Sequence, residues 1–299
     1  MYKWKDAEEI ERYSKKIQAL SFGGRLLMWP PPKQLERAGR KDPDSISLQW
    51  IADQSNSLHP TTELLVDIPN AIIRQGTVLK RSHSDCSHHV ILPQERRKRT
   101  TDNLKGLSPV GECWLQQEYI ATLKDVGEWR TFLVNGTVVH TVHTYRLSSA
   151  EAWQGRHVTS FWSLDELRWV NSRERLSAPP GTESITPYAF SEADRGNHAA
   201  RLKAKEEFES FAVTTWKSLV NVEKGVVVGT PCTAIFCRLD IGVMMRDAKI
   251  SYFVNEIERS LTTSLWMSAM PTGLHGVLAD TFGEVLHQWI SGAREPCHV

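Results

Sequence analysis

Hydrophobic and polar positions alternate most regularly between residues 113 and 146. The runs CWLQQEYIA, GEWRTFLV and TVVHTVHTY each follow the two-residue period of a strand with one buried face. Asn135-Gly136 separates the last two runs, and this dipeptide is the strongest short-range signal for a tight hairpin. The region therefore predicts three strands, two of them joined as an antiparallel hairpin.

Two more pairs of apolar runs flank polar turns. The first pair lies in TVLKRSHSDCSHHVIL, residues 77–92, on either side of a turn rich in serine and histidine. The second pair is TAIFCRLDIGVM and KISYFVNEIE, with a polar turn at Arg246-Asp247 between them. HPTTELL, residues 59–65, indicates a turn that leads into one more strand. Residues 34–66 are otherwise mixed and polar, without a clear period.

Three segments have the period of amphipathic helices: residues 5–20, residues 194–222 and a last helix near the end of the chain. The apolar stripe of the second segment consists of Leu202, Phe208, Phe211, Trp216 and Leu219. The stripe of the last consists of Leu274, Val277, Leu278, Val285, Leu286 and Trp289. Strands and helices do not alternate as βαβ units, so antiparallel hairpins covered by helices, an α+β fold, are expected.

The composition is that of a globular protein without a strong overall charge. The 299 residues are 40% hydrophobic and 24% charged, with a formal net charge of +1. No apolar run approaches the roughly 18 residues of a membrane span, and the first residues lack the pattern of a signal peptide. The five cysteines lack CxxC spacing, which favours a reducing compartment. We therefore expect a cytoplasmic protein that does not bind membranes.

Two segments without a clear period remain. ERRKRTT, residues 95–101, has no interleaved aromatic residues, so a solvated loop is favoured and no nucleic-acid partner is expected. Residues 147–193 are rich in tryptophan, serine and proline, and the segment is longer than an ordinary connection. We predict a lid or binding segment there, and a homodimer is compatible with it.

Acidic residues gather on the second pair of runs. Because strand side chains alternate, Glu256 and Glu258 share one face and Asn255 lies on the other. Arg238 and Asp240 share a face of the preceding strand. Three carboxylates on one surface would raise one another's pKa values, and a hard cation such as Mg²⁺ relieves the repulsion. The alternative is that the glutamates simply line the solvent face of an amphipathic strand.

The turn within residues 77–92 allows two interpretations. His83, Cys86, His88 and His89 lie close together, which is compatible with zinc ligands. Alternatively, the turn joins two strands and holds a phosphate, with Lys80 at the end of the first strand. Zinc sites in short loops usually need further ligands from a second knuckle, and no CxxC or HxxxH occurs elsewhere.

In this order, the motifs TVLK, LQQEYI, GEWRTFLVNGTVV, RLDIG and YFVNEIE resemble those of the ATP-grasp superfamily of carboxylate–amine ligases. The resemblance covers about residues 60–270. It implies two α+β subdomains of mostly antiparallel sheet, with covering helices, that grip ATP between them. The corresponding division is a reduced N-terminal region (1–65), a small subdomain with the phosphate loop (66–125) and a large subdomain (126–299) that contains the insertion 147–193.

The resemblance also implies a nucleotide site. Lys80 matches the lysine that contacts the ATP phosphates, and Ser82 and Ser84 lie in the loop that follows. Asp125 matches an acidic residue that holds the ribose. The hinge that holds the adenine matches four consecutive residues, Gln117, Glu118, Tyr119 and Ile120.

Catalytic and metal roles follow from the same resemblance. Arg130 matches the arginine that neutralises the transferring phosphoryl group, together with Lys80. The metal ligands match Asp240, Glu256 and Glu258, for Mg²⁺ or alternatively Mn²⁺. Candidates for contact with the acceptor substrate are His83, Arg146 and Arg238. The family usually has Asn where this chain has Glu258, and glycines where it has SHSDCSHH.

The hairpin turn limits which residues share a face. With two turn residues, Arg130 lies opposite Thr141, and Arg146 then falls on the other face unless a bulge intervenes. His140 and His143 lie on opposite faces, which argues against a paired-histidine metal site.

The function implied by the resemblance is ATP-dependent ligation. A carboxylate takes the γ-phosphoryl group of ATP, and an amine or similar nucleophile then displaces phosphate from the acylphosphate. The expected ligands are ATP, a metal ion, and small carboxylate and amine substrates. The alternatives are a small-molecule kinase, a non-catalytic nucleotide-binding or interaction protein, and a zinc-binding module.

Overall fold

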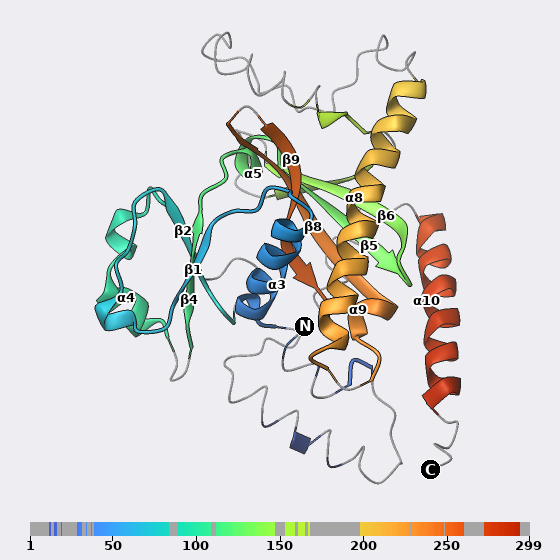
Figure 1. Cartoon of the computed structure of the whole chain (residues 1–299), viewed down its shortest axis with the longest axis horizontal. Coiled ribbons are helices and arrows are strands. Elements are labelled where there is room, and N and C mark those ends of the chain that lie inside the picture. Colours follow the sequence, from blue (N-terminus) through green and yellow to red (C-terminus); the bar gives the residue numbers. More distant parts are fainter. Residues whose placement is uncertain are drawn as a thin grey trace.

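The computed structural model describes residues 12, 15–16, 19, 29–31, 34, 37, 39–83, 89–108, 112–146, 153–158, 161–164, 167, 198–227, 229–247, 249–259 and 272–293 (Figure 1). These residues form two antiparallel sheets with helices between and beside them. The predicted helix over residues 5–20 and most of the insertion at 147–193 lie outside the described residues.

The first sheet has the strand order β1-β4-β2-β3. Its strands are β1 (Thr62–Leu65), β2 (Thr77–Arg81), β3 (Val90–Ile91) and β4 (Trp114–Glu118). Two single-turn helices, η1 (Ile68–Asn70) and η2 (Arg96–Lys98), and α4 (Thr101–Gly106) complete this part. Leu79, Leu104 and Trp114 are fully buried in its small core. β1 pairs with β4 along its whole length, although it precedes residue 66, where the sequence places the start of the small subdomain.

The second sheet has the order β7-β6-β5-β8-β9. Its strands are β5 (Glu128–Val134), β6 (Thr137–Arg146), β7 (Trp153–His157), β8 (Phe236–Arg246) and β9 (Lys249–Glu258), and α5 (Thr122–Asp125) precedes β5. β7 lies within the segment for which the sequence predicts a lid or binding segment, and it extends the sheet at β6. The predicted pairing of β8 with β9 is confirmed.

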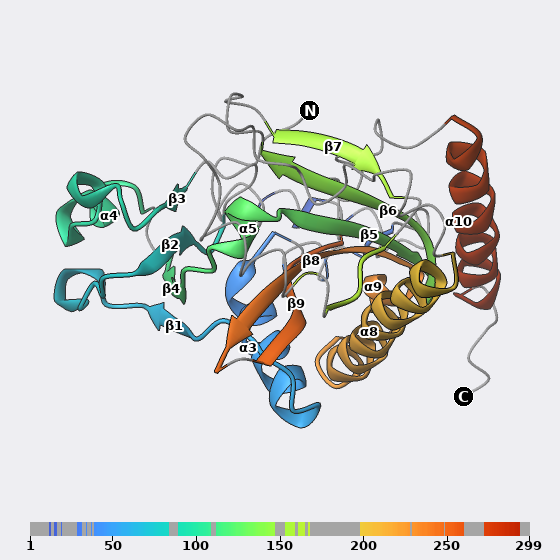
Figure 2. The ribbon, with the colours of Figure 1, turned by 90° about the horizontal axis from the view of Figure 1, so that it is seen from above.

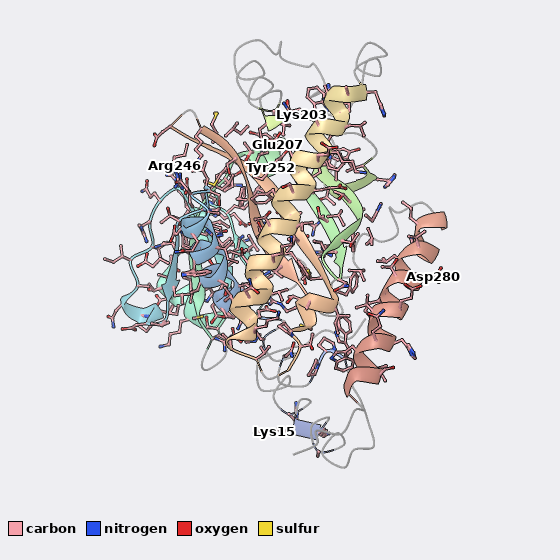
Figure 3. All side chains as sticks on the ribbon, turned by 45° about the vertical axis from the view of Figure 1, so that its right-hand side comes forward. Lys15, Lys203, Glu207, Arg246, Tyr252 and Asp280 are labelled. Carbon is pink, nitrogen blue, oxygen red and sulfur yellow. The ribbon has the colours of Figure 1, made fainter. Side chains whose placement is uncertain are left out.

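Two helices cover one face of the second sheet, which we call the apolar face. α8 (His198–Lys224) crosses this face, and α3 (Lys41–Gln54) packs against α8 and β9 (Figures 1 and 2). Phe208 of α8 is fully buried, with its ring 6.0 Å from Trp129 and 5.3 Å from Tyr252. Figure 3 shows Tyr252 beside α8. The predicted helix over 194–222 is thus confirmed, except that Leu202 of its stripe is exposed.

Helix α3 was not predicted, because the polar stretch that forms it has no clear apolar period. Leu48 and Ile51 contribute its buried contacts. Its first turn is fixed by Arg259, whose guanidinium contacts Asp44 at 2.7 Å and Glu223 of α8 at 3.0 Å. This buried ion-pair group sets the position of Lys41 at the start of the helix.

Two more helices belong to the second half of the chain. α9 (Cys232–Ile235) leads into β8, and α10 (Thr272–Ala293) packs Leu278 against Val134 at the end of β5. The predicted last helix is confirmed, although Val277 of its stripe is exposed.

The hairpin between β5 and β6 turns at Asn135-Gly136, as predicted. Both residues have positive φ, 47° and 75°, the conformation that an Asn-Gly turn adopts readily. The register, however, shifts between Phe132 and Leu133, so that Arg130 pairs with Val142. The prediction that Arg130 faces Thr141 is therefore wrong, because it assumed a hairpin without a bulge.

A second bulge interrupts the pairing of β8 with β9. Asp240 pairs with Glu256, but the next residue, Ile241, pairs with Val254, so Asn255 is the extra residue. A bulge of this kind re-aims the side chains beside it. Both bulges occur on the strands that form the polar site, on the face of the sheet opposite α8.

Candidate active site

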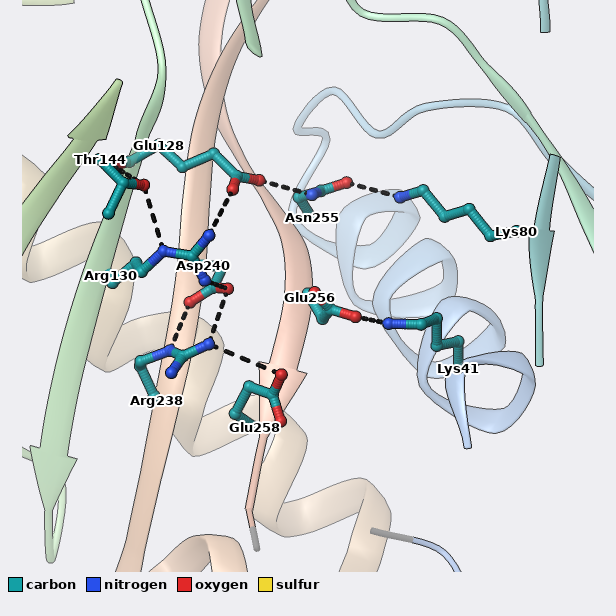
Figure 4. A network of polar contacts seen from close by, with 10 residues as sticks. All are labelled: Lys41, Lys80, Glu128, Arg130, Thr144, Arg238, Asp240, Asn255, Glu256 and Glu258. Atoms are coloured by element: carbon teal, nitrogen blue, oxygen red, sulfur yellow. Dashed lines mark hydrogen bonds and ion pairs between the residues drawn. The ribbon is translucent and has the colours of Figure 1, made fainter. Parts of the chain in front are cut away.

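The two sheets meet through a short chain of polar side chains. The Lys80 ammonium, at the end of β2, donates to Asn255 Oδ1 at 3.0 Å. Asn255 Nδ2 in turn donates to Glu128 Oε1 at 2.5 Å (Figure 4). The sequence placed Asn255 on the face opposite Glu256, and this is wrong because the bulge turns Asn255 toward the site.

Asp240 lies at the centre of the site and is completely buried. Arg238 contacts its carboxylate through Nε at 2.7 Å and Nη2 at 3.0 Å, and Arg130 Nη1 donates to Oδ2 at 2.5 Å. Burial would raise the pKa of Asp240, but Arg130 and Arg238 hold it below its usual value. The group therefore stays ionised and holds two guanidinium groups in place.

Arg130 is fixed on three sides. Besides Asp240, it contacts Glu128 Oε2 at 3.3 Å and donates from Nε to Thr144 Oγ1 at 3.1 Å. Thr144 reaches Arg130 because the bulge in the hairpin places Arg130, Val142 and Thr144 on one face. The backbone of Arg146, two residues further along β6, pairs with Trp153, and its side chain lies outside the described part of the structure.

The two glutamates of β9 each face a cation. Glu256 forms an ion pair with Lys41 of α3, and Glu258 lies 3.6 Å from Arg238 Nη2. Burial lowers the pKa of Lys41, and the carboxylates of Glu258 and Asp240 oppose this effect. Burial and the nearby Lys41 lower the pKa of Lys80 to about 8.

The oxygen donors of the site suit a hard cation in kind. Asp240, Glu256 and Glu258 offer carboxylates and Asn255 offers an amide oxygen, the ligands that Mg²⁺ accepts. Among the described residues, however, no three potential ligands converge as a metal site. Each carboxylate instead pairs with a lysine or arginine, so a metal bound here would compete with those cations.

The hinge residues lie where β4 leaves the first sheet. Glu118 Oε2 accepts from Arg246 at 2.5 Å and from the Thr61 amide at 3.2 Å. Gln117 donates to Thr62 within the sheet, at 3.0 Å. Ile120 packs in a small cluster with Met244 and Phe253.

Tyr119 of the hinge lies near Asp125, the candidate for contact with the ribose. Burial raises the pKa of Tyr119, and the carboxylate of Asp125 adds to the effect, so the two side chains lie within electrostatic reach. The structure thus places Tyr119 near Asp125. Neither residue is among the polar side chains that link Lys80, Asn255 and Glu128.

The start of the loop after Lys80 is held in place by contacts with α3. The hydroxyl of Ser82 donates to Asp42 of α3, and the Lys41 amide donates to the Ser82 carbonyl at 3.1 Å. His83 Nδ1 lies 2.8 Å from the buried Glu112. His83 therefore contacts Glu112 and not the polar side chains around Lys80, Asn255 and Glu128. Ser84, Cys86 and His88 lie outside the described residues.

Sequence reasoning missed three residues of the site: Lys41, Glu128 and Asn255 as a site residue. Lys41 lies in a polar stretch without a motif, and no signal pointed to it. Glu128 stands beside Arg130 in GEWR, and strand alternation would have placed both on one face. The orientation of Asn255 toward the site depends on the bulge in β9, which the alternation of residues does not reveal.

Comparison with known proteins agrees with this geometry. Residues 41–152 match the RimK-like ATP-grasp domain family. Two solved structures share the fold: the D-cycloserine synthetase DcsG and the D-alanine–D-alanine ligase of Bacillus anthracis, complexed with ATP. The first has a TM-score of 0.57 and 14% identity over 95% of this chain and 80% of that one. The second has a TM-score of 0.50 and 10% identity over 95% and 85%.

The fold is therefore the ATP-grasp fold, as the resemblance seen in the sequence implied. No curated protein matches the sequence significantly. No helix among the described residues is both long and apolar enough to cross a membrane.

Proposed function

We propose that the protein is an ATP-dependent ligase that joins a small carboxylic acid to an amine through an acylphosphate. The observation that carries the proposal is the buried group of Asp240 with Arg130 and Arg238, which faces Lys80 across the junction of the two sheets. Phosphoryl transfer needs positioned positive charge more than a covalent catalyst, and this group supplies it.

The reaction has two steps. A carboxylate oxygen of the acid attacks the γ-phosphorus of ATP, the bond to the β-phosphate oxygen breaks, and ADP leaves with that electron pair. The amine nitrogen then attacks the carbonyl carbon of the acylphosphate, and the bond between this carbon and the phosphate oxygen breaks. Phosphate leaves, and the amine proton passes to phosphate or water.

Arg130 and Arg238 act on the transferring group in this proposal. Their guanidinium groups donate N–H bonds to phosphoryl oxygens as negative charge moves from the γ- to the β-phosphate. Asp240 keeps both guanidinium groups in place at low reorganisation cost, because it is buried and contacts each of them. Neither arginine has to give up or accept a proton.

Lys80 and Lys41 bind the phosphates in this proposal. In the structure both ammonium groups contact the site's own polar side chains, Asn255 and Glu256. ATP phosphates offer stronger acceptors, so we expect the lysines to exchange these partners for phosphate oxygens. Asp240, Asn255, Glu256 and Glu258 would then hold Mg²⁺, which supplies charge that neutralises the phosphates when bound.

The hinge would hold the adenine ring. The backbone from Glu118 to Ile120 leads from β4 of the first sheet toward β5 of the second, and Tyr119 lies within electrostatic reach of Asp125. Asp125 is exposed and free to accept hydrogen bonds from a ribose, as its position in the motif implies.

The proposal is tested by ADP release with ATP and Mg²⁺ against panels of acids and amines, alone and in combination. A ligase releases phosphate only when an acid and an amine are both present. A kinase releases ADP with one acceptor and leaves the phosphate on it, an outcome that would replace the proposal. Absence of ATP binding in calorimetry would overturn it and favour a non-catalytic role.

A further inference from the structure

His140 of β6 is a buried polar group without a role in the site described above. Its side chain is 4% exposed, and neither ring nitrogen has a hydrogen-bond partner in the described part of the chain. Buried nitrogen atoms of this kind are nearly always bonded, because losing water without replacement costs free energy. The two open nitrogens therefore point to a ligand.

Two more histidines surround His140, and we call the three the histidine cluster: His140, His157 of β7 and His275 of α10. The rings of His140 and His157 stack at 4.7 Å with 14° between their planes, and Phe132 stacks on the other side at 5.9 Å. Nδ1 of His157 is also buried without a partner. Burial, then His157 and His275, lower the pKa of His140 to about 4.

The histidine cluster lies on the same face of the sheet as the active site. Arg130 pairs with Asp240 on one side and with Val142 on the other, and Val142 pairs with His157. One row further along, Arg238 pairs with Phe132, and Phe132 with His140. Since neighbouring strands are about 4.8 Å apart, His140 lies about 10 Å from Arg238 along its row.

The geometry argues against a shared metal ion as the ligand. Two rings stacked nearly parallel do not direct their nitrogens at one ion, and the described residues contain no converging group of three ligands. An oxyanion fits better, because imidazole N–H groups donate to carboxylate or phosphate oxygens. The titratable groups that act on His140 are His157 of β7 and His275 of α10. When the histidines are protonated, a bound anion would reduce the repulsion between their positive charges.

We propose that the histidine cluster is an oxyanion subsite, which binds a carboxylate or phosphate group through His140 and His157. Binding is coupled to proton uptake, because an anion favours the charged imidazole, whereas burial favours the neutral one. The subsite therefore binds its anion more tightly as the pH falls.

The position suggests the class of ligand, and this part rests on the proposed function. A small acid whose reacting carboxylate lies at Arg130 and Arg238 would extend along the row toward His140. A second carboxylate on that acid would then reach the histidine cluster. The substrate class is a dicarboxylic acid or an amino acid with an acidic side chain.

The test is a titration of the protein, with histidines labelled for NMR, using inorganic phosphate and, separately, succinate and acetate. We expect the signals of His140 and His157 to shift with succinate, at about tenfold lower concentration near pH 6 than near pH 8. Phosphate tighter than succinate would overturn the dicarboxylate assignment, and equal effects of acetate and succinate would do the same.

The deciding variant is His140→Phe, which keeps a ring between Phe132 and His157 and removes both nitrogens. We expect this variant to fold and to bind succinate at least about tenfold more weakly than the parent does. His287→Gln, an exposed position on α10, is the matched control and should bind as the parent does. Parental binding by His140→Phe would overturn the oxyanion subsite, as would a signal shift induced by Zn²⁺ but by no anion.

ATP affinity is measured on the same samples. Retained ATP binding with no anion response rejects only the subsite. An anion response without any ATP binding rejects the proposed function and the dicarboxylate assignment, and leaves the oxyanion subsite standing.

Discussion

The two faces of the second sheet are both buried, but by different means. On one face, Trp129 and Leu239 pack against Phe208 of α8, and hydrocarbon excludes water. On the other face, Arg238 and Asp240, the neighbours of Leu239 in β8, are equally inaccessible to water and are held by ion pairs. The apolar face depends on volume, whereas the polar face depends on each charge keeping its partner. Mutations on the apolar face should therefore lower stability alone, whereas mutations on the polar face should also lower catalysis.

The polar face should be the most sensitive to loss of a single charge. Asp240→Asn leaves Arg130 and Arg238 without their shared carboxylate, so we expect ATP turnover to fall about a thousandfold or more. The free energy of unfolding should also fall by about 3 kcal/mol, because a buried guanidinium loses its partner. ADP release and urea denaturation measure the two effects.

Asp247→Asn is the matched control for this change. Asp247 lies at the exposed turn between β8 and β9 with φ of 50°, a conformation that Asn accepts. It should change neither turnover nor stability. Parental turnover in Asp240→Asn would show that the polar face is not the catalytic one.

The apolar face should respond in stability alone. Phe208→Ala removes a fully buried ring from α8 and should lower the free energy of unfolding by about 3–5 kcal/mol. The folded fraction should bind ATP as the parent does. Leu202→Ala, on the exposed side of the same helix, should cost no more than about 0.5 kcal/mol. A large loss of ATP affinity in folded Phe208→Ala would break the division between the faces.

Lys80 tests the contribution of the first sheet to the polar face. Lys80→Ala removes the group that contacts Asn255, and we expect ATP to bind about 10- to 100-fold more weakly, as for loss of a charge-assisted hydrogen bond. Calorimetry with ATP and Mg²⁺ gives the affinity. Lys98→Ala is the control, at an exposed lysine of η2, the single-turn helix between β3 and α4. Equal affinities for the parent and Lys80→Ala would exclude Lys80 from the phosphate site.

Gly136 tests the hairpin that orders both faces. A Cβ atom there would lie 2.4 Å from the Trp216 ring of α8, and the φ of 75° is unfavourable for alanine. Gly136→Ala should lower the free energy of unfolding by about 1–3 kcal/mol, measured by urea denaturation. A neutral effect would mean that the turn and α8 do not pack as the structure has them.

The smallest effect is the pH dependence of ATP affinity. The pKa of Lys80 is lowered to about 8, so the ammonium loses its proton as the pH rises through 8, and ATP affinity should fall over that range. Below this pH the lysine is charged and affinity should be level. Lys80→Arg keeps its charge at every pH used and should flatten the profile. A profile unchanged by Lys80→Arg would assign the pH dependence to another group.

The sequence predicted the apolar face better than the polar one. Apolar runs and turn signals were enough to find β5, β6, β8 and β9 and the two hairpins β5–β6 and β8–β9, because burial of one face imposes a two-residue period. The pairing of β5 with β8, which joins the hairpins into one sheet, was not predicted. Ordered motifs such as RLDIG and YFVNEIE carried the prediction of the ATP-grasp fold.

The polar face depends on features that a period does not contain. One bulge turned Asn255 into the site, and another brought Thr144 beside Arg130. Lys41 reaches Glu256 only because Arg259 fixes α3 through long-range ion pairs. The metal ligands, the adenine contacts, the division into subdomains and the homodimer stay predictions.

The central claim, ligation through an acylphosphate, is tested most directly by isotope transfer. An acid substrate labelled with ¹⁸O in its carboxylate is turned over with ATP and an amine, and the released phosphate is analysed by mass spectrometry. The account predicts one ¹⁸O atom in each phosphate, because the carboxylate oxygen leaves with the phosphoryl group. Phosphate without label, or phosphate retained on the acceptor, would contradict it.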